Sequence, residues 1–186
     1  MSRKESEGKS GMKKEKTLTL REMLVFSLLG TVMFLGKIVM EWAPNVHPLA
    51  LLIVAYTSVY RTKALIPIYL FVFMEGLYAG FSLWWVPYLY LWVILWGAVM
   101  LLPQSMPNKV RVPVLMAVAG LHGLLYGTLY APFQALAFGL SFQGMLAWIV
   151  SGLPWDCVHA AGNLVLSSLA VPLISLLKRL DLGIRA

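Results

Sequence analysis

Polar and ionisable side chains are rare in this 186-residue sequence, and four of them recur at spacings of three, four and four residues. They are Asp156, His159, Asn163 and Ser167. At 100° per residue, these side chains lie within an arc of roughly 80° on one helix face. Ionisable groups at membrane depth cost at least about 2.5 kcal/mol each, so they face a bundle interior, a cavity or a partner. The stripe therefore predicts a substrate-binding surface or a polar contact between helices.

A second polar group is predicted on the same side of the membrane. Lys37 lies near the outer end of the first apolar stretch, Glu41 follows one turn later, and Asn45 and His47 belong to the next polar turn. Glu75 lies in the middle of a later apolar stretch. One interpretation is an outward-facing binding pocket to which all five residues contribute. The other is a set of helix-end residues, with Lys37 neutralised by Glu41 or Glu75.

Aromatic residues form a third candidate surface. One helix face, about 80° wide, carries Trp85, Tyr88, Trp92 and Trp96. Tyr88 and Trp92 lie deeper than Trp84 and Trp85 and are candidates for stacking on a planar ligand, although packing against lipid or core predicts the same pattern. The positions of Trp84, Trp85 and Trp155 are typical of an interfacial aromatic belt.

Enzyme chemistry is not visible in the sequence. Cys157 and His159 are too few ligands for a metal, and there is neither a nucleotide-binding loop nor a recognisable nucleophile motif. We therefore expect a protein that is not an enzyme and holds no metal or cofactor. His122 is expected to be a hydrogen-bonded core histidine. Small residues in the same stretch, Gly120, Gly123 and Gly127, predict close helix packing.

The composition predicts the elements that must position these residues. Hydrophobic residues make up 60% of the chain and charged residues 12%, against about 25% charged in soluble domains. We predict an all-α integral membrane protein with six transmembrane helices, at residues 20–41, 48–60, 64–81, 86–102, 112–130 and 155–177. The second has 13 residues, about 20 Å against a hydrocarbon core of about 30 Å, so it must start below the surface or be shielded by protein.

The domain organisation follows from these spans. Residues 20–180 form one six-helix substrate-binding domain, after a disordered basic cytoplasmic tail at 1–19 and before a short cytoplasmic tail at 181–186. The apolar segment 133–153 is interrupted by glycines, so we predict an interfacial or re-entrant stretch there. With both termini in the cytoplasm, fourteen of the fifteen Lys and Arg residues lie in inner segments and the outer loops hold none. This distribution follows the positive-inside rule.

Two short motifs resemble those of energy-coupling factor (ECF) transporter S components, the small substrate-binding subunits of prokaryotic vitamin importers. Residues 44–48, Pro-Asn-Val-His-Pro, resemble the "PN-V-x-P" turn after their first helix. Residues 152–163, GLPWDCVHAAGN, resemble the opening of their last helix, "G-(I/L)-P-(F/W)-D-x-x-H-x-x-x-N". The resemblance spans residues 20–180.

The resemblance implies a subunit of an ABC importer in a prokaryotic plasma membrane. It would capture a vitamin or precursor outside and topple when coupled to a T subunit and two cytoplasmic ATPases. The family's Ala-x-x-x-Ala docking motif corresponds to Ser27-x-x-x-Thr31, with Gly30 beside it. The alternatives are a structural or assembly membrane protein and a small secondary carrier, although no internal repeat supports a carrier.

The ligand expectation rests on charge. The outer half holds three carboxylates, those of Glu41, Glu75 and Asp156, against one cation, Lys37. Such a site disfavours polyanions such as folates. It favours a neutral or cationic heterocycle, with cobalamin as the first choice and thiamine-like compounds next.

Overall fold

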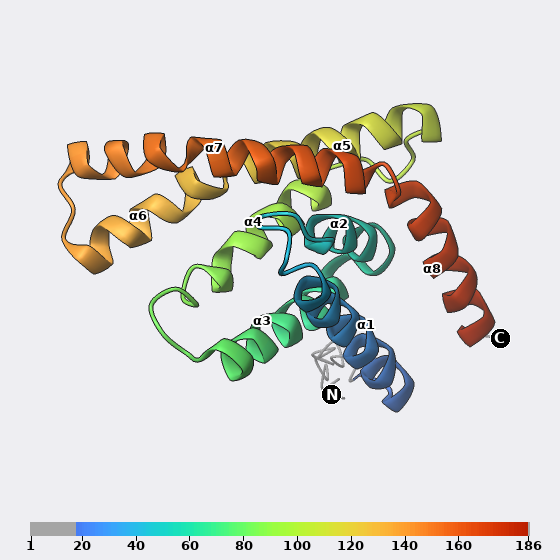
Figure 1. The fold of residues 1–186 in the computed structure, drawn as a ribbon. Coiled ribbons are helices and arrows are strands. Elements are labelled where there is room, and N and C mark those ends of the chain that lie inside the picture. Colours follow the sequence, from blue (N-terminus) through green and yellow to red (C-terminus); the bar gives the residue numbers. More distant parts are fainter. Residues whose placement is uncertain (1–17, 186) are drawn as a thin grey trace, which may run out of the picture.

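The computed structural model describes residues 18–185, so residues 1–17 of the predicted N-terminal tail and Ala186 lie outside the described residues. The described chain consists of helices without a β-strand, which confirms the all-α class. The elements are α1 (Leu20–Val39), α2 (Leu49–Tyr60), the 3₁₀ helix η1 (Arg61–Ala64), α3 (Leu65–Ala79), α4 (Tyr88–Met100), α5 (Asn108–Leu124), α6 (Tyr126–Phe138), α7 (Phe142–Ser167) and α8 (Ala170–Arg185) (Figure 1).

The short helix α2 lies at the centre of the molecule. Its first nine residues, from Leu49 to Thr57, are all buried, as expected for a helix that is apolar on every side. Both α4 and α8 pack against it. The expectation that this short helix is shielded by protein is therefore confirmed.

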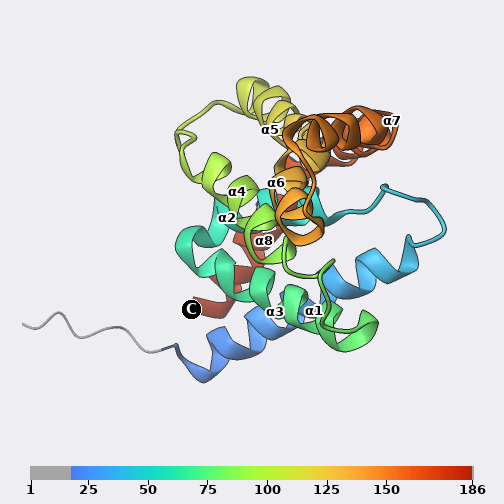
Figure 2. The ribbon, with the colours of Figure 1, turned by 90° about the vertical axis from the view of Figure 1, so that its left-hand side faces the viewer.

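Two pairs of helices lie on either side of this centre. Helix α1 packs against α3, and α5 packs against α7 along an extensive contact. Figures 1 and 2 both show the α1–α3 pair on one side, the α5–α7 pair on the other, and α2 and α4 between them. Residues distant in the sequence thereby meet between the two pairs.

The structure corrects the predicted boundaries around residues 131–154. Helix α6 continues through Pro132 to Phe138, and α7 begins at Phe142 rather than at Trp155. The chain turns between them, where Gly139 adopts a left-handed conformation (φ 66°) and the Ser141 hydroxyl accepts a hydrogen bond from the backbone N–H of Gly144. Segment 133–153 is thus two helical arms that pack on each other, because tertiary contact outweighs the local effect of Pro and Gly.

The end of the last helix also differs from the prediction. A break at residues 168–169 separates α7 from α8, which is bent by 51° relative to α7. Helix α8 then continues to Arg185, beyond the boundary at residue 180 that we predicted.

Several helices have the length and hydropathy needed to cross a membrane. By these criteria Leu20–Val39, Leu49–Ala79 and Asn108–Phe138 qualify, and the bent pair α7–α8 qualifies if it counts as one span. Helix α4 is apolar but shorter. The described part of the chain therefore has three to four candidate spans, and its large exposed apolar side chains are consistent with a membrane protein.

Candidate functional site

A cavity of about 270 Å³ opens near the N-terminal ends of α2 and α4. It is lined by residues from the α1–α2 loop, the segment around the start of α4, α6 and α7: Asn45, His47, Trp84, Tyr88, Tyr126, Tyr130 and His159. None of them is Lys, Arg, Asp or Glu. Every lining residue except Asn45 carries an aromatic ring, so the cavity suits a planar ligand.

The rings of this aromatic–histidine cavity contact one another at short distances. The His159 ring lies 5.1 Å from the His47 ring and 4.9 Å from the Tyr126 ring, measured between centroids. Trp92, which is 1% exposed, lies behind them at 5.5 Å from Tyr88 and 5.8 Å from Tyr126. The loop, α4, α6 and α7 therefore meet at one aromatic cluster.

Three buried polar atoms of this cluster have no hydrogen-bond partner among the described residues. They are His47 Nδ1, His159 Nε2 and Trp92 Nε1. Buried polar atoms are normally paired, and the two histidines both line the cavity. Burial, aided by the positive charge of Lys37, lowers the pKa of His47 to about 4, so its imidazole is neutral at pH 7. A neutral imidazole can donate one hydrogen bond and accept another.

The structure thus gathers part of the predicted site. Asn45, His47, Tyr88 and His159 line the cavity, and Trp92 adjoins it. Sequence reasoning missed Tyr126 and Tyr130 and assigned Trp84 to an interfacial belt. A signal for the tyrosines was present, because His122, Tyr126 and Tyr130 recur every four residues and so share one helix face.

Asp156 and Asn163, which we predicted to bind the ligand, do not line this cavity. Both oxygens of the Asp156 carboxylate accept hydrogen bonds from the backbone N–H of Gly127, each at 3.1 Å. The Asn163 amide donates to the carbonyl oxygen of Ala119 at 3.1 Å. These side chains join α7 to α5 and α6, and we call this contact the α5–α7 seam.

Glycines make the α5–α7 seam possible, as the sequence predicted. A Cβ atom at Gly123 would lie 2.8 Å from Asn163 Nδ2 and 2.9 Å from the backbone nitrogen of Ala160. One at Gly127 would lie 2.5 Å from Asp156 Oδ2, and one at Gly120 would meet the side chain of Leu164. His122 Nε2 lies 3.0 Å from the carbonyl oxygen of Leu91, as expected of a core histidine.

Lys37, Glu41 and Glu75 form a separate ion-pair group. Lys37 Nζ lies 2.6 Å from Glu75 Oε2 and 4.0 Å from Glu41 Oε1. The Glu75 side chain is fully buried, whereas that of Glu41 is 47% exposed. The Lys37–Glu75 ion pair therefore links α1 to α3. None of the three residues lines the aromatic–histidine cavity.

The predicted docking residues differ in their surroundings. Ser27 is exposed and its carbonyl oxygen accepts a hydrogen bond from the Thr31 hydroxyl at 2.9 Å. Gly30 is buried, and a Cβ there would lie 3.0 Å from Leu70 and 3.2 Å from the carbonyl oxygen of Pro67. Gly30 thus belongs to the α1–α3 contact and not to an open docking face.

The described residues include no cluster of three or more His, Cys, Asp or Glu side chains that could hold a metal ion. Comparison with protein-family models, curated proteins and solved structures finds no match for this chain. The fold and the site together define a class: an all-helical chain with helices of membrane-spanning length and an uncharged aromatic–histidine cavity between them.

Proposed function

We propose that this protein is a membrane-embedded substrate-binding subunit that captures a small planar heterocycle in the aromatic–histidine cavity. The observation that carries the proposal is the pair of unpartnered nitrogens, His47 Nδ1 and His159 Nε2, on side chains that line this cavity. A heterocycle with ring nitrogens or an amide would pair with both histidines and stack on the tyrosines.

The arrangement of charges supports a neutral or cationic ligand. The carboxylates of Asp156 and Glu75 are paired with Gly127 and Lys37, so the cavity is lined by neutral donors, acceptors and rings. Its volume of about 270 Å³ lies just below the range of roughly 300–1,000 Å³ for drug-sized ligands. A thiamine-sized vitamin suits this volume, whereas cobalamin, which is several times larger, would require the aromatic side chains to separate.

The proposal includes the ECF S-component role, with six spans, both termini in the cytoplasm and a prokaryotic plasma membrane. One cavity is lined by residues from three predicted inner segments, Arg61, Arg111 and Lys178. Lys63, which belongs to the same inner segment as Arg61, pairs with Glu22 near the start of α1. This grouping supports the topology. The exposed Ser27 on α1 supports contact with a T subunit, through which two ATPases would drive release.

The test is a melting experiment on the purified full-length protein in detergent with a vitamin panel that includes thiamine, cobalamin and folate. We expect a neutral or cationic heterocycle to raise the melting temperature. His159→Ala should weaken its affinity at least tenfold, about 1.4 kcal/mol, because one ligand atom then loses its partner. A matched control is Asn163→Ala on the same helix face, which should lower stability and change affinity less than twofold.

Two outcomes would contradict the proposal. Tight binding of folate would overturn the charge argument. No stabilisation by any compound, together with equal effects of the two substitutions, would favour a structural or assembly protein without a transported ligand.

A further inference from the structure

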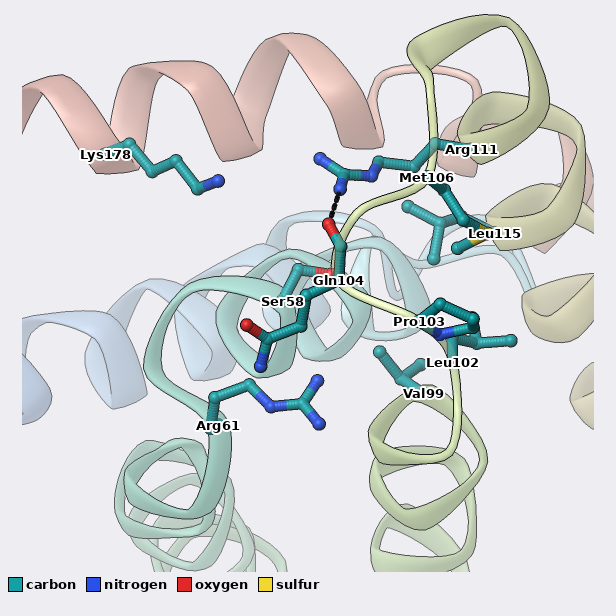
Figure 3. A pocket seen from close by; sticks show the side chains of 10 residues that line it. All are labelled: Ser58, Arg61, Val99, Leu102, Pro103, Gln104, Met106, Arg111, Leu115 and Lys178. Carbon is teal, nitrogen blue, oxygen red and sulfur yellow. Dashed lines mark hydrogen bonds between the residues drawn. The ribbon is translucent and has the colours of Figure 1, made fainter.

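A second cavity, of about 110 Å³, lies at the opposite ends of α2 and α4 from the aromatic–histidine cavity. Three cationic residues line it, each from a different part of the fold: Arg61 after α2, Arg111 on α5 and Lys178 on α8. Figure 3 shows the Lys178 and Arg111 side chains extending toward one another on either side of Gln104. No Asp or Glu lines this cationic cavity.

The three cations lack negatively charged partners within the part of the chain that the structure describes. None of the ion pairs formed within residues 18–185 includes Arg61, Arg111 or Lys178. Like charges that converge without a counter-charge repel one another. An anion bound between these residues would offset this repulsion, and the cluster of positive charge attracts one.

The arginines are held in place by the backbone. Arg61 donates a hydrogen bond to the carbonyl oxygen of Met100 at 2.8 Å, and Arg111 donates to the carbonyl oxygen of Gln104. The carbonyl of Arg61 itself accepts a hydrogen bond from Trp96 Nε1 at 3.0 Å. Arg61 also has φ 54°, an unfavourable conformation for a residue with a side chain. Strain of this kind persists where the surrounding contacts impose it, often at binding sites.

We propose that the cationic cavity binds a phosphate group, which interacts with both guanidinium groups and the Lys178 ammonium. A guanidinium has several N–H donors, so one bond to a carbonyl leaves others for phosphate oxygens. The cavity is well below the size of sites for whole drug-like ligands, which suits a single phosphate. Its source is the head group of an anionic lipid or free phosphate, and basic pockets between helices on the cytoplasmic side are suited to lipid head groups.

The test compares melting temperatures of the full-length protein in nanodiscs of phosphatidylcholine, with and without phosphatidylglycerol. Phosphatidylglycerol should raise the melting temperature, and Arg111→Gln and Lys178→Gln should each lose at least half of that rise. The matched controls Lys109→Gln and Arg179→Gln remove exposed neighbouring charges on the same helices, outside the cavity. They should keep most of the rise.

A second arm adds inorganic phosphate to phosphatidylcholine nanodiscs, against sodium chloride at equal ionic strength. Stabilisation by phosphate that depends on Arg111 and Lys178 identifies free phosphate as the source, and stabilisation by the lipid alone identifies the head group. Equal losses in all four variants would show general charge attraction and overturn the site. Absence of stabilisation in both arms would also overturn the phosphate site. Equal retention of phosphatidylglycerol by all variants in native mass spectrometry would overturn it as well.

Discussion

The aromatic–histidine cavity and the α5–α7 seam take their polar side chains from one stripe of α7, yet they use them differently. In the seam, Asp156 and Asn163 are hydrogen-bonded to backbone groups of α5 and α6. In the cavity, His159 lies between them in sequence, on the same helix face, and its Nε2 has no protein partner within the described chain. The difference separates polar groups that hold helices together from a polar group that is open to a ligand.

The comparison shows that spacing alone does not identify a binding site. A polar stripe on a membrane helix satisfies its hydrogen bonds wherever a partner backbone comes close enough, and the glycines of α5 permit that approach. Where Tyr126 faces α7, its ring contacts the His159 ring and both rings line the cavity. Substitutions in the seam and in the ion pair should therefore change stability, and those in the cavity should change the response to ligand and pH.

The largest effect is expected at the ion pair between α1 and α3. Lys37→Met leaves the fully buried Glu75 carboxylate without its partner, which destabilises a fold by about 3–5 kcal/mol. The melting temperature in detergent should fall by about 10 °C. Adding Glu75→Leu to the Lys37→Met protein should recover most of the lost melting temperature, because the unpaired buried charge is then removed.

The control for this pair is Glu41→Gln. Glu41 is half exposed and 4.0 Å from Lys37, so its loss should change stability by less than about 1 kcal/mol. If Lys37→Met instead left the melting temperature unchanged and abolished ligand binding, Lys37 would belong with the cavity residues and not with the residues that stabilise the fold.

A smaller effect is expected from closing the space in the α5–α7 seam. In Gly123→Ala the new methyl group would meet both Asn163 and the backbone of α7, and overpacking of this kind costs about 1–3 kcal/mol. Gly97→Ala is the matched control, since a Cβ there meets nothing within 4 Å. We expect a melting temperature several degrees lower for Gly123→Ala only. Equal melting of the two variants would mean that the seam is looser than the geometry indicates.

Much of this fold was predictable, because hydropathy and charge act on whole segments. The apolar helices, the shielding of the short α2 and the glycine contacts of α5 all follow from composition and spacing. The boundary near Pro132 was wrong, since the loss of one backbone hydrogen bond is outweighed by packing of α6 on α7, which no local pattern reveals. The cavity was predicted only in part for the same reason: whether His159 or Asp156 meets a partner depends on α5 and α6, which are distant in the sequence.

The smallest effect is expected from pH at the cavity. The pKa of His47 is about 4 in the folded protein and about 6.5 in an unfolded chain, so between these values the unfolded state binds more protons. The stability contributed by neutral His47 is therefore complete above pH 6.5 and falls as the pH decreases toward 4. Lowering the pH from 7 to 5.5 should remove about 1 kcal/mol through this residue.

His47→Gln should make the melting temperature less sensitive to pH across this range, by about 2–4 °C. The Asn163→Ala protein is the control, because the Asn163 amide does not titrate over this range. Its melting temperature should therefore differ from that of the unmodified protein by the same amount at every pH. Parallel pH profiles for His47→Gln and the unmodified protein would mean that His47 is hydrated in the folded state, and the cavity would then lose one of the two unpartnered nitrogens on which ligand capture depends.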